Sequence, residues 1–217
     1  MTHKGNANIL TDKYLERRYE SDFMSSEIQF IDLGLPSGTL WADRNIGADA
    51  PEDYGEYFRW GETTPFMEDS YNYDYSDLGD NIAGTKYDVA TTILGKGYMM
   101  PTYEQLNELL HSCTWERTTI NGVYGMKVTG LNGNSIFLPA AGFYYNISRE
   151  LAGKFAGKLA AVGSGGYYWT AMHGKLYGKK YSGIFLDFNS HFCTWALFDL
   201  GGGLTIRPVK TSKKSTL

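Results

Sequence analysis

The chain has 217 residues and a formal net charge of −4, with 26 glycines, 17 tyrosines and five tryptophans. This length supports one large domain or two small ones, each with a real hydrophobic core. The acidic balance argues against sequence-independent nucleic-acid binding, which depends on Lys and Arg neutralising phosphates. Two cysteines are too few for a disulfide framework, so we expect Cys113 and Cys193 to be free and partly buried, a single bridge between them being the alternative.

No run approaches the ~20 apolar residues of a membrane helix, so we expect no membrane insertion. The opening MTHKGNANILTDKYLERR has no apolar core resembling a secretory signal. Residues 1–26 are polar, with Ile9, Leu10, Tyr14 and Leu15 spaced as in a short amphipathic helix. They predict an N-terminal tail or attachment segment, and a frayed terminus fits equally well. One domain is predicted over 27–211, followed by a C-terminal tail at 212–217.

The domain is predicted to begin with two short strands, IQFIDLG and TLWADRNIG, separated by a turn at 36–38. A helix is predicted next, with Asp49 as N-cap and Pro51 in the first turn. Tyr54, Tyr57 and Phe58 would form its apolar stripe. Residues 63–98 show little periodicity and predict a long loop region.

The acidic run at 68–80 raises the question of a calcium loop. Its residues Asp74, Asp77 and Asp80 are spaced by three, unlike the alternating oxygen ligands and terminal Glu of an EF-hand. We therefore predict no metal site there.

The strongest helix signal starts at Thr102, where Gln105 completes a capping box before the buried face of Leu106, Leu109 and Leu110. The helix should end near Cys113. An antiparallel meander is predicted next, from TWERTTI through VYGMKVTG to SIFLPA, because the intervening Asn-Gly pairs supply the positive φ of tight turns. A helical turn is possible over 149–159. The segments SGIFLDF, HFCTWALF and LTIRPVK predict closing strands, with a sharp reversal at 201–203.

Six blocks carry a family resemblance: IDLGLPSGTLWADRNIGA, EDYGEYFRWGET, MPTYEQLNELL, NGNSIFLPAAG, YYWTA and LTIRPVK. In this order they resemble the paralogous domain that occurs in many copies in Fibrobacter and Bacteroides. The resemblance implies an α+β, C-type lectin-like fold with two helices, an antiparallel sheet, long loops and adjacent terminal strands. The chain departs from the family pattern at Leu94 and Tyr98, where Trp is usual, and at Met99, where Arg is usual.

The implied fold is also similar to that of the variable proteins of diversity-generating retroelements, in which a hypervariable block near the C-terminus binds ligand. The corresponding block here is 171–198, and its flanks hold the predicted scaffold residues. The scaffold residues are Trp41, Trp60, Trp169, Arg207 and Pro208. The predicted ligand-binding residues mix apolar, aromatic and charged side chains, as contact surfaces do. They are Met172, His173, Lys175, Tyr177, Lys179, Lys180, Tyr181, Phe185, Asp187, His191, Phe192, Thr194, Trp195, Leu197 and Phe198.

Strand alternation places Leu186 and Phe188 on one face and Phe185 and Asp187 on the other, which we expect to be exposed. Trp195 is a candidate hot spot, although a buried Trp fits the pattern nearly as well. Arg207 is expected to pair with a carboxylate or carbonyl beneath the binding face. An ordinary solvated loop is the alternative for 172–181.

The four histidines show no metal-ligand spacing, and the chain has neither a nucleophile elbow nor the calcium-binding triplets of sugar-binding lectins. We therefore expect no cofactor and no catalysis. The leading hypothesis is a non-enzymatic protein that binds a protein or glycan receptor on a target cell, acting at a cell surface or on a virion. A fixed-specificity carbohydrate-binding or adhesin module and a structural subunit are the alternatives, and a homo-oligomer is compatible with each.

Overall fold

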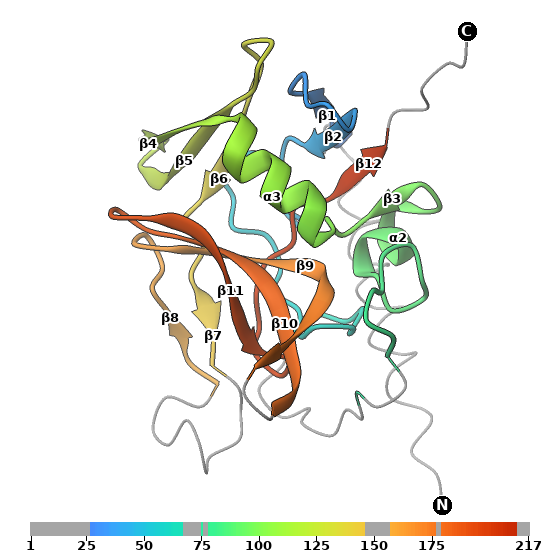
Figure 1. Ribbon diagram of the computed structural model, residues 1–217. Coiled ribbons are helices and arrows are strands. Elements are labelled where there is room, and N and C mark those ends of the chain that lie inside the picture. Colours follow the sequence, from blue (N-terminus) through green and yellow to red (C-terminus); the bar gives the residue numbers. More distant parts are fainter. Residues whose placement is uncertain (1–26, 67–74, 76–77, 146–156, 177–178, 212–217) are drawn as a thin grey trace, which may run out of the picture.

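The computed structural model describes residues 27–66, 75, 78–145, 157–176 and 179–211 (Figure 1). Within these residues the protein is a strand-rich α+β fold whose sheets are all antiparallel. The helices are α2 (Val89–Leu94) and α3 (Tyr103–Ser112). The strands are β1 (Phe30–Asp32), β2 (Thr39–Ala42), β3 (Tyr98–Met99), β4 (Thr114–Ile120), β5 (Val123–Thr129), β6 (Ser135–Pro139), β7 (Phe143–Tyr144), β8 (Leu159–Ala160), β9 (Gly166–Leu176), β10 (Lys179–Phe188), β11 (Cys193–Asp199) and β12 (Val209–Thr211).

The first and last strands of the domain belong to one sheet of order β1-β2-β12-β3. Val209 pairs with Trp41 of β2 on one side and with Met99 of β3 on the other. The resemblance implies adjacent terminal strands, and this detail is wrong for β1 and β12 because β2 lies between them. The two ends of the domain are nevertheless held in one sheet.

Helix α3 begins as the sequence predicts. The Gln105 N–H donates to Thr102 Oγ1 at 3.3 Å, and the Thr102 N–H donates to Gln105 Oε1 at 2.9 Å. This reciprocal capping box satisfies two N–H groups that the first turn leaves free. Leu106 and Leu109 are buried in the core below. Figure 1 shows α3 crossing the middle of the molecule beside β9 and β11.

The predicted meander is also confirmed. Strands β4, β5 and β6 form a three-stranded sheet in chain order. Asn121 and Gly122 join β4 to β5 with φ angles of 48° and 84°, the left-handed conformations that a tight two-residue hairpin needs.

The sheet of order β11-β10-β9 separates two hydrophobic cores. One core contains Tyr168, Leu186 and Phe188 together with the buried face of α3. The other contains Trp169 and Phe185. Because the cores cover both faces of β9 and β10 at these positions, the two strands carry buried apolar side chains on both sides.

The helix predicted from Asp49 onward does not form. The Ala50 N–H donates to Asp53 Oδ2 at 2.9 Å, which makes a turn, and Gly55 has a φ of 71°. The chain then runs extended, so that Phe58 bridges Leu204 with backbone hydrogen bonds in both directions. The aromatic spacing that suggested a helix belongs to a buried extended segment.

The region expected to be a long loop contains α2, which is capped by a buried carboxylate. Asp88 accepts hydrogen bonds from the N–H groups of Ala90 and Thr91 at the helix start. It also accepts from Gly84 and Met100, which fastens the loop on either side. Most of the acidic run at 68–80, most of the predicted turn at 149–159 and both tails lie outside the described residues.

Candidate functional site

The turn between β10 and β11 presents two side chains to solvent. The Asn189 side-chain oxygen accepts hydrogen bonds from the N–H groups of His191 at 2.8 Å and Phe192 at 3.3 Å. The Asn189 N–H donates to the Phe192 carbonyl at 3.0 Å. Such an Asx turn fixes the backbone locally. His191 is exposed and Phe192 is 46% exposed, so a defined turn displays an imidazole and a phenyl ring.

Strand β11 anchors some of its side chains and displays others. Cys193 packs against one core and Phe198 against the other. Between them, Thr194 is exposed and Trp195 is 40% exposed, while Leu197 is partly buried. Among the described strands β11 lies at the edge of its sheet. The two ends of the strand are therefore anchored, while Thr194 and Trp195 between them reach solvent on opposite faces of the sheet.

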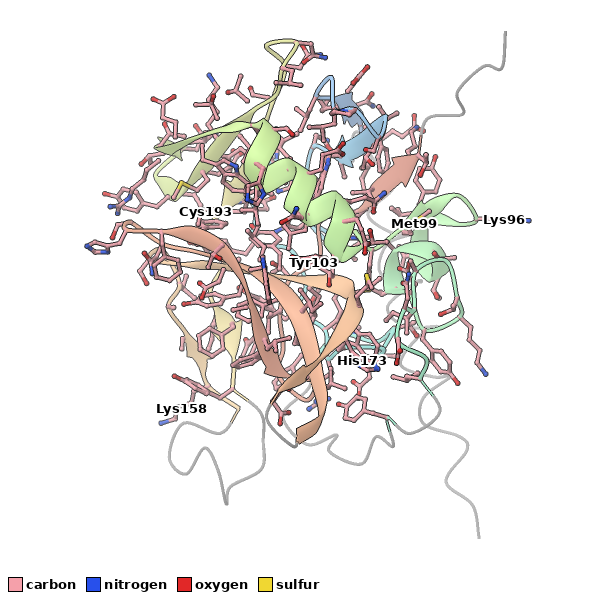
Figure 2. All side chains as sticks on the ribbon, in the orientation of Figure 1. Lys96, Met99, Tyr103, Lys158, His173 and Cys193 are labelled. Carbon is pink, nitrogen blue, oxygen red and sulfur yellow. The ribbon has the colours of Figure 1, made fainter. Side chains whose placement is uncertain are left out.

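The exposed indole of Trp195 is supported by helix α3. The ring of Tyr103 meets it edge to face, with the centroids 5.3 Å apart and the planes at 88°. The Tyr103 N–H donates to the sulfur of Met172 on β9 at 3.4 Å. Figure 2 shows Tyr103 where the start of α3 meets this sheet. Tyr103 lies outside 171–198 and is absent from the predicted set, although its spacing of three residues from Leu106 places it at the start of the apolar stripe of α3 and is a usable signal.

His173 bridges two segments and has little surface left for a ligand. Its side chain is 16% exposed, and Nε2 lies 2.7 Å from Oδ1 of Asp80. The His173 N–H donates to the Asp80 carbonyl at 3.1 Å, and the ring meets Trp60 edge to face at 6.0 Å. These contacts fasten the segment around Asp80 to β9, beside α2, as the position of His173 in Figure 2 indicates.

The prediction that Phe185 is exposed is wrong. Phe185 is 4% exposed and lies in the core that contains Trp169. Phe198 is partly buried against the same core, where its ring meets Phe185 at 5.8 Å and Trp169 at 6.2 Å. Alternation assigned Phe185 to the correct face, but a second core covers that face.

Asp187 stands at the margin between this core and solvent. In the sheet register it lies opposite Thr194 on β11 and Tyr167 on β9. Burial raises the pKa of the Asp187 carboxyl, and one of its oxygens is buried without a hydrogen-bond partner in the described structure. Burial, and then the Asp187 charge, also raises the pKa of Tyr167. A partly desolvated carboxylate beside an exposed threonine could accept a hydrogen bond from a bound molecule.

Beneath the displayed residues, Trp60 and Trp169 tie two chain segments together. Trp169 Nε1 donates to the Phe58 carbonyl at 2.8 Å, and Trp60 Nε1 donates to the Thr170 carbonyl at 2.9 Å. Both indoles are fully buried. Each indole therefore binds a backbone carbonyl in the segment that carries the other tryptophan.

Arg207 is buried and binds carbonyls, one of the two partner types that we predicted. Its Nη1 donates to the Ala42 carbonyl at 3.1 Å and its Nη2 to the Phe137 carbonyl at 2.8 Å. Burial lowers the pKa of Arg207 to about 10, so the guanidinium remains charged at neutral pH. Trp41 of β2 and Pro208, which directly precedes β12, are also buried.

Part of the predicted site lies beyond what the structure describes. The side chains at 175–181 belong to this part, and Tyr177 lies wholly outside the described residues. The predicted residues concerned are Lys175, Tyr177, Lys179, Lys180 and Tyr181.

Both thiols are free, as predicted, and neither has the character of a reactive nucleophile. Burial raises the pKa of Cys113 to about 11 and that of Cys193 to about 12, whereas reactive cysteines have lowered pKa values. In the described part of the chain, no cluster of three or more His, Cys, Asp or Glu side chains is placed to hold a metal ion.

No family model, curated protein or solved structure matches this chain. Of the helices that the structure describes, neither has the length and apolar character needed to cross a bilayer. The observations that bear on function are therefore the six sequence blocks and the side chains displayed around β11.

Proposed function

We propose that this protein is a non-enzymatic receptor-binding protein that displays a diversified surface at 171–198, in the manner of the variable proteins of diversity-generating retroelements. It would bind a protein or glycan on a target cell and act at a cell surface or on a virion. The observation that carries the proposal is the division within β11, where Cys193 and Phe198 are anchored while Thr194 and Trp195 face solvent.

This division lets recognition chemistry vary without loss of the fold. Binding residues are commonly carried on segments that a rigid scaffold positions. Aromatic side chains such as Phe192 and Trp195 offer a large contact area with few rotatable bonds, so that little conformational entropy is lost on binding. Asp187 and Thr194 add hydrogen-bonding groups at the same edge.

A C-type lectin-like fold is part of this proposal. The six sequence blocks support it, as do the two helices and the placement of the first and last strands of the domain in one sheet. In this interpretation the β9–β11 sheet carries the binding surface, and Trp60, Trp169 and Arg207 belong to the constant frame.

The test is a binding comparison of the wild-type protein with Trp195→Ala and Phe192→Ala on a glycan array and a panel of bacterial cells. We expect each variant to lose roughly tenfold or more in affinity for whatever target the wild type binds, the range of interface hot spots. Leu131→Ala is the matched control, because Leu131 is a 66% exposed apolar side chain in the β5–β6 turn, where the neighbouring Asn132 binds the Asp32 carbonyl. Equal binding by all variants would refute the proposal.

The claim of diversification has a separate test in the DNA. A near-repeat of the segment that encodes 171–198, differing mainly at adenines and lying beside a reverse-transcriptase gene, is expected near this gene. Its absence would leave a fixed binding protein.

That second candidate, a carbohydrate-binding module of fixed specificity, is favoured by one observation. Tyr103 meets Trp195 through an edge-to-face contact, and Trp195 remains partly exposed, as in platforms on which sugar rings stack. A single strong glycan hit that is abolished in both Trp195→Ala and Tyr103→Ala would support this candidate over a diversified surface.

A further inference from the structure

A groove on a different part of the molecule has the construction of a ligand site. It has a volume of about 430 Å³ and lies between β1, the segment around Asp43 and Pro51, and the β4–β6 sheet. Pockets that bind small ligands commonly range from about 300 to 1,000 Å³. None of its lining residues belongs to 171–198, so the groove is separate from the proposed receptor surface.

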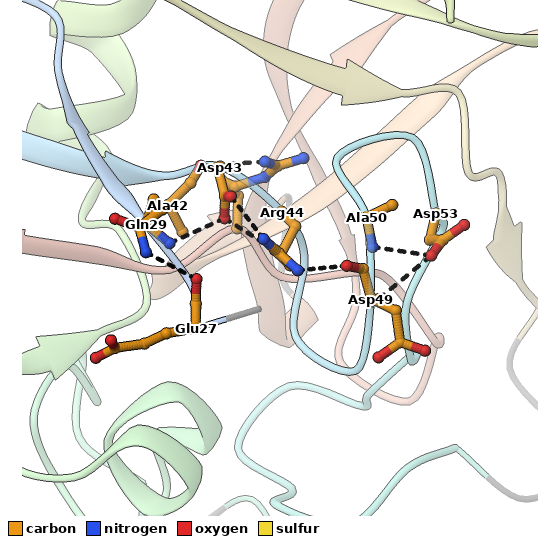
Figure 3. A network of polar contacts seen from close by, with 9 residues as sticks. Glu27, Gln29, Ala42, Asp43, Arg44, Asp49, Ala50 and Asp53 are labelled. Carbon is orange, nitrogen blue, oxygen red and sulfur yellow. Dashed lines mark hydrogen bonds and ion pairs between the residues drawn. The ribbon is translucent and has the colours of Figure 1, made fainter. Parts of the chain in front are cut away.

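The wall formed by residues 43–53 is held by a charged clamp (Figure 3). Arg44, which is 4% exposed, donates to both carboxylate oxygens of Asp43, from Nε at 3.0 Å and from Nη2 at 2.8 Å. Its Nη1 also donates to the Asp49 carbonyl. Asp53 then accepts from the N–H groups of Asp49 and Ala50, at 3.3 Å and 2.9 Å. The wall is thereby fixed without a ligand.

Hydrogen bonds also join this wall and β1 to the turns of the β4–β6 sheet. Asn121 Nδ2 in the β4–β5 turn donates to Glu52 Oε1 at 2.5 Å. Asn132 and Asn134 in the β5–β6 turn both donate to the Asp32 carbonyl at 2.9 Å. Because the walls are tied in this way, the groove has the pre-formed shape typical of small-molecule sites.

The lining combines an apolar surface with polar groups that lack partners. Ile31 and Ile120, which are partly exposed, supply the apolar part, and Phe137, which is 4% exposed, lies beneath them. Thr118 and Ser135 supply hydroxyls that form no hydrogen bond within the described residues. The register pairs Lys127 with Phe137 on the face turned away from the first core, which holds Val128, Ile136 and Leu138.

Asp43 and Lys127 are the charged side chains that line the groove. Asp43 is already neutralised by Arg44. Lys127 is exposed and forms no ion pair in the described structure, although Glu116 stands opposite it in the register of β4 and β5. The lining therefore offers one unpaired ammonium group, two hydroxyls and an apolar surface.

From this arrangement we infer that the groove binds a small amphipathic carboxylate whose aromatic or branched aliphatic body lies on Ile31 and Ile120 and whose carboxylate pairs with Lys127. A lysine ammonium beside an apolar wall suits such a ligand, because the aliphatic stem packs along the body while the charge meets the head. The inference does not depend on the proposed receptor binding.

The experiment titrates the full chain with 3-phenylpropanoate and, separately, with 3-phenylpropylamine, followed by amide shifts in NMR spectra. The two probes share a body and differ in the charge of the head group. We expect the carboxylate to shift the amides of Thr118, Lys127 and Ser135, and the amine to leave them unchanged. Lys127→Gln should weaken carboxylate binding about fivefold, the upper range for a partly exposed ion pair.

Lys127→Glu should reverse the preference toward the amine, which a non-specific apolar groove would not do. Lys96→Gln removes an exposed charge beside α2 and is the matched control; it should leave both titrations unchanged, as should Trp195→Ala. Equal binding of the two probes, binding of neither, or an unchanged preference in Lys127→Glu would overturn the inference. A response centred on Trp195 would also overturn it, whereas loss of receptor binding alone would count only against the proposed function.

Discussion

Two tryptophans on the β9–β11 sheet differ in their exposure to solvent. Trp169 is fully buried, donates a hydrogen bond to Phe58 and contacts Phe185. Trp195 lies on β11, which pairs with the other side of β10, and it is 40% exposed. The difference lies in what covers each side chain, and it separates residues that hold the sheet from residues that the sheet displays.

The largest expected difference is in stability. Trp169→Ala should lower the free energy of unfolding by about 3–5 kcal/mol, because it removes a large buried ring and leaves a cavity. Trp195→Ala should cost less than about 1 kcal/mol, since solvent already reaches the side chain. Urea unfolding followed by circular dichroism measures both. Similar losses in the two variants would show that Trp195 belongs to the frame.

The reactivity of the Cys193 thiol tests whether β11 stays packed against the core while Thr194 and Trp195 face solvent. Burial raises the pKa of Cys193 to about 12, which strongly lowers the thiolate fraction at pH 8, and thiolate is the reactive form. In a Cys113→Ser background, iodoacetamide should therefore react far more slowly with native protein than with protein unfolded in guanidinium. Comparable rates would mean that the strand opens readily.

Glycine-to-alanine substitutions test the rigidity of the buried rings by adding a single methyl group. A Cβ at Gly183 would lie 2.6 Å from Cζ3 of Trp169 and 3.1 Å from Cδ1 of Trp60. Gly183→Ala should therefore cost about 1–3 kcal/mol through overpacking.

Gly174 on β9 provides the control, because a Cβ there would meet chiefly Cδ2 of Leu197, at 2.4 Å. The end of a partly buried leucine can rotate away, so Gly174→Ala should cost less than about 1 kcal/mol. Thermal unfolding of the two variants decides the point. If Gly174→Ala is the costlier change, the rings beneath β10 are not the rigid frame.

The parts of the fold that could be predicted depend on local chemistry. The capping box of Thr102 and Gln105 and the turn at Asn121 and Gly122 specify their backbone through neighbouring residues alone. The false helix after Asp49 had a helical aromatic spacing but was decided by a distant partner, since Phe58 bridges Leu204. The spacing of apolar residues in the sequence carries no information about that long-range pairing.

The residues of the candidate site also divide into those that the sequence could predict and those that depend on long-range packing. Position in the sequence placed Phe192, Thr194 and Trp195 in the predicted binding block, but it left open whether Trp195 is exposed or buried, and the structure shows it 40% exposed. Alternation could not distinguish Phe185 from an exposed residue, because the second core covers its face. Tyr103 comes from a helix distant in sequence, and only the packing of α3 on the sheet brings it to Trp195.

The smallest effect concerns Asp187, which belongs neither to the frame nor fully to the displayed set. Burial raises its pKa above the ordinary 3.8, so the native state binds a proton more tightly than the unfolded state does. Stability is therefore lost as pH rises from about 3.8 through the raised pKa. Asp187→Asn should remove this loss and stabilise the protein at pH 7, by less than about 1 kcal/mol because the carboxylate is only half-buried and solvent screens it.

The measurement compares unfolding free energies of Asp187→Asn and wild type at pH 4 and pH 7. The gain should be present at pH 7 and smaller at pH 4, where more of the wild-type carboxyl is protonated. A loss of stability at pH 7 would instead assign Asp187 to the frame. The Asp187 carboxylate lowers stability, and one of its buried oxygens has no hydrogen-bond partner in the described structure. A residue of this kind is commonly retained for binding. The same variant should therefore bind receptor more weakly while unfolding less readily, and these opposite changes would place Asp187 with the displayed residues.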